Sequence, residues 1–105
     1  MFKKISNTQS KHIKNLHRKK NRQNFNEFIV EGTKTVLEFV NSSYVCKGIF
    51  AQEEWLEEHI SDLNPSVCYS IISKQLSQIS TFKNPQPVLA VFEMKQNTRD
   101  YNEDF

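Results

Sequence analysis

A basic segment near the start of the chain is the part of the sequence whose residue types point most directly to a chemistry. Residues 10–25 read SKHIKNLHRKKNRQNF, and residues 1–26 contain eight Lys/Arg and no Asp or Glu. The remaining 79 residues contain six Lys/Arg and all twelve acidic residues, so a net charge of +2 conceals a segment of +8 (8 − 0) joined to a body of −6 (6 − 12). This asymmetry predicts that the partner is a polyanion or an acidic surface.

If this segment is helical, four of its cations lie on one side of the helix. We expect a helix over residues 10–22 with Ser10 as its N-cap. Ile13 and Leu16 would then dock this helix on the body. Within an arc of about 80°, roughly opposite those two residues, the helix would present a ridge of four cations: Lys11, Lys14, Arg18 and Arg22. The alternative is a solvated helix face, but the segment has no acids to form the i,i+4 pairs that stabilise such a face.

The rest of the chain offers no arrangement typical of catalysis or metal binding. Cys46 and Cys68 stand in strand-like runs without a CxxC motif or a nearby His pair. We expect two free thiols, with a disulfide or a metal site as the alternatives. His59 stands alone on an expected helix and is assigned no ligand role. We find no Ser/His/Asp set, no paired carboxylates and no Gly-rich phosphate loop, so we expect neither a metal nor a catalytic site.

Strand-like and helix-like pieces alternate along the body. The pattern predicts strands at 27–31, 44–51, 66–72 and 87–94, and helices at 33–43, 53–65 and 73–79. Thr35-x-x-Glu38 has the form of a capping box, Asn64-Pro65 marks the end of the second of these helices, and Ser73 is the expected N-cap of the third. This alternation predicts a layered α/β domain.

Length and hydropathy bound the class of protein. A chain of 105 residues is one domain. No window approaches the ~18 apolar residues of a transmembrane helix, and the basic start lacks the apolar stretch of a secretory signal. We therefore expect a soluble, cytoplasmic protein that does not contact a membrane. The polar residues 96–105 are expected to be a linker or frayed tail beyond a domain of residues 1–95.

Four short elements follow one another in a recognisable order. Ile5, Gln9, Ile13 and Lys14 match the pattern I-x-S-x-Q-N-P-x-[IV]-K, and residues 20–22 match K-x-R. Residues 28–32 match F-[IL]-V-E-G, and residues 80–91 are similar to S-x-x-x-x-P-Q-G-[VI]-[LI]-A-V. In this order the elements resemble the N-terminal substrate-binding domain of SpoU/TrmH-type RNA ribose 2′-O-methyltransferases. The resemblance spans residues 5–92, and the third and fourth elements together carry most of its specificity.

The resemblance implies a fold and a partner. The fold would be a three-layer-like α/β domain with a central mixed sheet of about four strands, flanking helices and a basic N-terminal helix, as in certain ribosomal and kink-turn-binding proteins. The partner would be RNA, either rRNA or tRNA. Family members continue into a domain that binds S-adenosylmethionine and dimerises, and its motifs do not appear here, so this chain alone is expected to hold no cofactor and to be non-catalytic. The residues expected to contact RNA are Lys11, Lys14, Arg18, Lys19, Lys20, Arg22 and Lys83.

Several positions depart from the family pattern or have two interpretations. Ser10-Lys11 replaces the usual Asn-Pro, and Pro87 replaces a Gly, which forbids a positive φ there. Asn21 stands where Gly is common, and Asn tolerates a left-handed turn. Arg22 either binds phosphate or pairs with Glu31. Glu31-Gly32 is interpreted as structural, with Gly32 allowing the following helix to begin.

Two hypotheses from other classes compete with RNA presentation to a methyltransferase. One is a stand-alone ribosome-associated or kink-turn-binding protein without an attached enzyme. A longer reading frame with S-adenosylmethionine motifs would exclude it. The other is a targeting segment of the mitochondrial type on a domain that does not bind RNA, which N-terminal sequencing of the mature protein would reveal.

Overall fold

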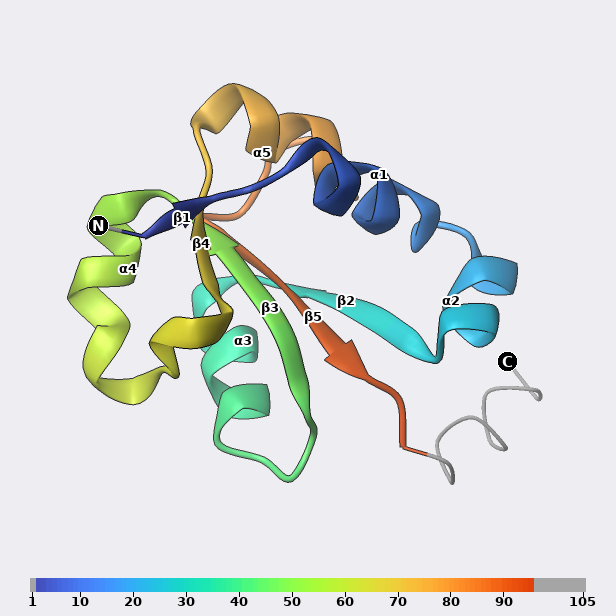
Figure 1. Ribbon diagram of the computed structural model, residues 1–105, viewed down its shortest axis with the longest axis horizontal. Helices are drawn as coiled ribbons and strands as arrows, with labels where there is room; N and C mark the ends of the chain where they lie inside the picture. The colour runs from blue at the N-terminus through green and yellow to red at the C-terminus, as the bar shows by residue number, and fades with distance from the viewer. Residues whose placement is uncertain (1, 96–105) are drawn as a thin grey trace.

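The computed structural model describes residues 2–95 and shows one sheet with helices on both faces (Figure 1). The expected tail at 96–105 lies outside the described residues. The strands are β1 (Lys3–Lys4), β2 (Glu27–Glu31), β3 (Cys46–Ala51), β4 (Cys68–Ser70) and β5 (Val88–Glu93). The helices are α1 (Asn7–Asn15), α2 (Lys19–Phe25), α3 (Thr33–Val40), α4 (Glu53–His59) and α5 (Ser73–Ile79). Two 3₁₀ turns, Ile60–Asp62 and Pro65–Val67, connect α4 to β4.

The sheet is mixed, with strand order β1-β4-β3-β5-β2. β1, β4 and β3 run parallel, whereas β5 is antiparallel to β3 on one side and to β2 on the other. The expected α/β class with a mixed sheet is thereby confirmed. The sheet has five strands rather than about four because the two residues of β1 pair with Tyr69 and Ser70. A two-residue strand carries too little periodicity to be recognised from sequence.

Alternation along the central strands builds a separate core on each face of the sheet. Ile49 and Ala51 pack against α3 and α4, whereas Phe50, between them, packs against α1 and α5. The same alternation runs through residues 88–92, all of which are buried. A strand covered on both faces has an almost continuous apolar sequence, which explains the run VLAVF. The domain is therefore a helix–sheet–helix sandwich.

Three of the expected helix signals are corrected by the structure. α3 begins at Thr33 with Gly32 as its N-cap, so Thr35-x-x-Glu38 is not a capping box. Gly32 has φ +102°, which L side chains rarely adopt, and this conformation starts the helix earlier than Thr35 would. Ser73 is the first residue of α5 rather than its cap. The helix expected at 53–65 ends at His59, and a 3₁₀ turn at Ile60–Asp62 follows it. Asn64 does not end this helix but caps a separate 3₁₀ turn that begins at Pro65.

Both cysteines are free, as expected. Burial raises the pKa of Cys46 to about 11 and also raises the pKa of Cys68. At neutral pH both thiols are therefore protonated, which disfavours nucleophilic or metal-binding roles. Within residues 2–95 no group of three or more His, Cys, Asp or Glu is placed to hold a metal ion. In the same part of the chain, no helix has the length and apolar character needed to cross a membrane.

Candidate nucleic-acid interface

The first helix begins four residues earlier than expected. Ser6, not Ser10, is the N-cap of α1. The Ser6 hydroxyl accepts a hydrogen bond from the backbone N–H of Gln9 at 3.0 Å, and the Gln9 side chain accepts one from the N–H of Ser6 at 2.9 Å. This reciprocal capping box satisfies two of the N–H groups that a helix start leaves unpaired. Its signature, S-x-x-Q, is present in the sequence.

The expected single helix over residues 10–22 is wrong, because the chain turns between α1 and α2. The N–H groups of His17 and Arg18 bond to carbonyl groups three residues earlier, at Lys14 and Asn15, which tightens the last turn. Arg18 then adopts an extended conformation with φ −101° and ψ 134°. The Arg18 and Arg22 side chains therefore do not continue a ridge along the same helix as Lys11 and Lys14.

Two side chains of α2 satisfy the carbonyl groups that this turn exposes. The Asn21 amide donates to the carbonyl of Asn15 at 2.9 Å, and Arg22 Nη1 donates to the carbonyls of Leu16 and His17, both at 3.0 Å. A cation at the C-terminal end of a helix also complements its dipole. Arg22 is thus a capping residue, and of its two proposed roles the pairing with Glu31 is not formed.

Arg22 provides a test of this capping role. Arg22→Ala should lower the free energy of unfolding by about 1–2 kcal/mol, because two carbonyls, one of them in a part-buried hydrogen bond, lose a charged donor. Arg18→Ala is the matched control, since Arg18 is exposed and should change stability by less than about 0.5 kcal/mol. Urea denaturation followed by circular dichroism measures both variants. Equal losses from the two variants would contradict the capping role.

Ile13 and Leu16 dock the first helix on the sheet, as expected. Their side chains are only 1% and 0% exposed, and they belong to the core that also contains Leu76 and Ile79 of α5. His17 adds a polar link, because its Nε2 donates to the carbonyl of Ile79 at 2.7 Å. The end of α1 is therefore attached to the end of α5 by both apolar and polar contacts.

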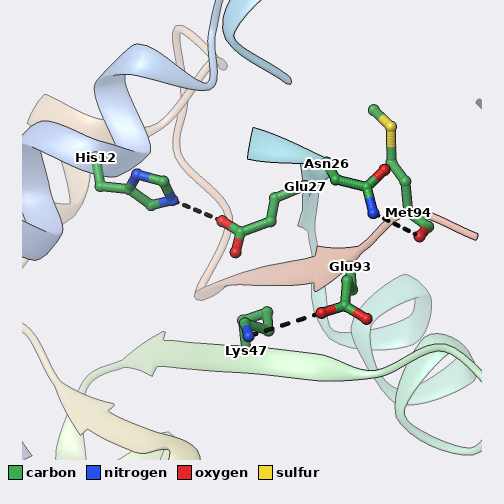
Figure 2. Close-up of polar contacts among 6 residues, drawn as sticks. All are labelled: His12, Asn26, Glu27, Lys47, Glu93 and Met94. Carbon is green, nitrogen blue, oxygen red and sulfur yellow. Dashed lines mark hydrogen bonds and ion pairs between the residues drawn. The ribbon is translucent and has the colours of Figure 1, made fainter. Parts of the chain in front are cut away.

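A second set of contacts attaches this end of the molecule to β2 and β5 (Figure 2). His12 Nε2 lies 2.6 Å from the Glu27 carboxylate, and the Phe25 ring meets the His12 ring edge-on at 4.7 Å. Asn26 ends α2 in a left-handed conformation with φ 61°. Its side chain donates to the carbonyl of Met94 at 3.3 Å, and its own carbonyl accepts from the Met94 N–H at 2.8 Å. The left-handed residue is thus Asn26, whereas Asn21 is helical.

The structure leaves most of the expected RNA-contacting cations exposed. Lys11 and Lys14 lie on α1, Arg18 lies in the turn, and Lys19 and Lys20 begin α2. We define the basic surface as the exposed side chains of Lys11, Lys14, Arg18 and Lys20. In Figure 1 α2 lies at the opposite end of the molecule from α4, which carries four exposed carboxylates at Glu53, Glu54, Glu57 and Glu58. The basic surface and the carboxylates of α4 are therefore separated in space.

The remaining candidate, Lys83, is exposed in the loop 80–87, which Glu31 holds in place. The Glu31 carboxylate accepts hydrogen bonds from the Ser80 hydroxyl at 2.6 Å and from the Thr81 N–H and hydroxyl at 2.9 and 2.5 Å. The Gly32 N–H donates to the carbonyl of Val88 at 3.0 Å. The structural interpretation of Glu31-Gly32 is thereby confirmed. The sequence did not predict that Ser80 and Thr81 are the partners of Glu31. The only signal in the sequence was that the motif containing Glu31 (residues 28–32) and the motif containing Ser80 (residues 80–91) occur in the same chain.

A scan against protein families identifies the class of domain. The family described as the MRM3-like substrate binding domain matches residues 2–90. The chain belongs to this family. The SpoU/TrmH resemblance seen in the motifs is thereby confirmed. A search of curated proteins finds no match.

The solved structures with a similar fold include proteins described as methyltransferases. A protein from Porphyromonas gingivalis assigned to the TrmH family is 28% identical with a TM-score of 0.73, and the match covers 88% of this chain and 36% of that one. An rRNA methyltransferase from Sinorhizobium meliloti is 24% identical with a TM-score of 0.71, over 89% and 36% of the two chains. The SpoU methyltransferase AviRb from Streptomyces viridochromogenes, in complex with AdoMet, is 18% identical with a TM-score of 0.66, over 86% and 36%. The chain thus spans about a third of the length of these proteins.

Proposed function

We propose that this domain recognises RNA and presents it to a methyl-transferring domain. The observation that carries the proposal is the basic surface, whose four exposed cations lie within a stretch of ten residues, in a segment that contains no acidic residue. The family to which the chain belongs is itself described as a substrate binding domain. Cations that neutralise phosphates supply most of the sequence-independent affinity for nucleic acids. The acidic α4 at the far end of the molecule would repel phosphates, so the charge separation also orients the domain toward RNA.

The finer activity is part of the same proposal. The whole protein would transfer a methyl group from S-adenosylmethionine to a ribose 2′-oxygen of rRNA or tRNA, in the cytoplasm and as a homodimer formed through the methyl-transferring domain. The domain described here would contribute binding and positioning of RNA. Holding a substrate in a reactive geometry is itself a large contribution to rate.

Titration of the chain with a labelled single-stranded RNA, followed by fluorescence anisotropy, tests the proposal. We expect modest affinity, about micromolar, and a slope of log K against log salt of about −3, since four phosphate contacts on single-stranded RNA release counterions. An absence of binding at low salt would exclude the proposed function.

The cofactor provides a separate prediction. We expect this chain alone to show no affinity for S-adenosylmethionine tighter than about millimolar, because its two glycines cannot supply the close backbone approaches that a cofactor loop requires. One of the two, Gly32, is the N-cap of α3 and therefore already has a structural role. Isothermal titration calorimetry measures this directly, and a micromolar dissociation constant would contradict it.

A further inference from the structure

Phe82 is an exposed aromatic residue in an unusual position. The residue is 48% exposed and lies in the loop 80–87. Phe25 is similarly exposed, but its ring contacts His12 edge-on at 4.7 Å. Among the described residues, no aromatic pair includes Phe82. A single exposed apolar residue is common on protein surfaces, so the exposure of Phe82 alone assigns no role.

The backbone that carries Phe82 is held by a network of hydrogen bonds. The Phe82 N–H donates to the Ser80 hydroxyl at 3.0 Å, and that hydroxyl donates to the Glu31 carboxylate at 2.6 Å. Thr81 adds two further hydrogen bonds to the same carboxylate. The loop is thereby fixed to the end of β2, and Phe82 is presented from an ordered backbone. An ordered loop loses little conformational entropy when a ligand binds.

The Glu31 carboxylate bonds to Ser80 and Thr81, the two residues before Phe82, whereas the residue after Phe82 is a cation. That cation, Lys83, is exposed. Ile79, three residues before Phe82, accepts the hydrogen bond from His17 at the end of α1. His17 directly precedes Arg18 of the basic surface. The contact between His17 and Ile79 therefore links the chain just before Arg18 to the chain just before the loop 80–83.

We propose that Phe82 is a stacking platform for an unpaired nucleobase of the RNA, with Lys83 contacting the adjacent phosphate. The proposal rests on the proposed RNA-binding function and names the part of the substrate that this loop recognises. Unstacked bases gain favourable energy by stacking on aromatic side chains, whereas bases within a duplex are unavailable. Lys83, next to Phe82 in the chain, favours an anionic ligand such as RNA over an apolar protein surface.

The first experiment places a fluorescent reporter at the platform. In Phe82→Trp the new indole should be quenched when single-stranded RNA binds, because a stacked base deactivates its excited state. Ile72→Trp is the matched control, since Ile72 is an apolar residue that is 62% exposed and lies at the start of α5. Trp55 is buried and contributes the same background to both variants. Equal quenching of both variants, or of neither, would overturn the proposal.

The second experiment separates stacking from charge. Phe82→Ala should weaken binding of single-stranded RNA about fivefold or more while leaving the salt slope unchanged, because a phenyl ring releases no counterions. Lys83→Ala should instead reduce the slope by about 0.7. With a fully paired duplex, Phe82→Ala and wild type should bind equally. Ile72→Ala should match wild type with both RNAs.

The outcomes distinguish this proposal from the one on which it rests. If wild type binds single-stranded RNA and Phe82→Ala binds equally well, the platform is excluded while the RNA-binding function stands. An equal loss with single-stranded and duplex RNA would also overturn the platform. If wild type binds neither RNA, both proposals fail.

Discussion

Reversing two charges of the basic surface is expected to weaken RNA binding at least tenfold. In Lys14→Glu/Arg18→Glu two phosphate contacts are lost and two repulsive charges are added. The slope of log K against log salt should fall in magnitude by about 1.4, because two of the four contacts of the basic surface are lost. Fluorescence anisotropy with a labelled single-stranded RNA between low and moderate salt measures both quantities.

The control variant changes the net charge by the same amount, but at two positions outside the basic surface. In Lys47→Glu/Lys74→Glu both substitutions lie in the acidic body, on β3 and α5. Lys47 pairs with Glu93 at 3.7 Å, but both side chains are about half exposed and such a pair contributes little to stability. RNA affinity should therefore fall far less than in the first variant. Equal losses would show that net charge drives binding and that the position of the basic surface is irrelevant.

The second large effect is expected from the apolar residue that docks this surface on the sheet. Leu16 is completely buried in the core between the sheet, α1 and α5. Leu16→Ala should lower the free energy of unfolding by about 2–5 kcal/mol, because the lost transfer energy is increased by the cavity that remains. Domains of this kind are stable by only about 5–15 kcal/mol, so the variant would be close to its unfolding limit.

Urea denaturation of Leu16→Ala measures this effect, with Ile72→Ala as the control. Ile72 is apolar but mostly exposed, and its substitution should change stability by about 0.5 kcal/mol or less. The m-value should stay constant if the native state remains compact. A loss below about 1 kcal/mol for Leu16→Ala would contradict the docking of α1 on the sheet.

The strands were the most predictable part of the fold. The expected strand at 27–31 coincides with β2, and the expected strand at 87–94 contains β5. Both have strong local signals, since the first is short and rich in aromatic and β-branched residues and the second is a continuous apolar run. The burial of Ile13 and Leu16 was also predictable, because these are the apolar residues in an otherwise polar segment.

The turn between α1 and α2 was not predictable from periodicity, because it depends on side chains that bond to carbonyl groups five or six residues earlier in the chain. Asn21 and Arg22 replace the backbone donors that the carbonyls of residues 15–17 would have had in a continuous helix. In the sequence an Arg at position 22 contributes only charge and helix propensity. The partners of Glu31 were hidden for a related reason, since residues 31 and 80 meet only when the sheet is complete.

The place of β5 in the sheet has a consequence for how the chain folds as it is synthesised. β5 is the last described strand in the sequence, yet it lies between β3 and β2, and in the described sheet β2 pairs with no other strand. Closing such distant pairings is entropically costly and slows folding. Ile13 and Leu16 leave the ribosome early but pack in a core that includes Leu89 and Val91. Within the described domain, the end that carries the basic surface is therefore synthesised before β5 but completes its packing only after β5 has been synthesised.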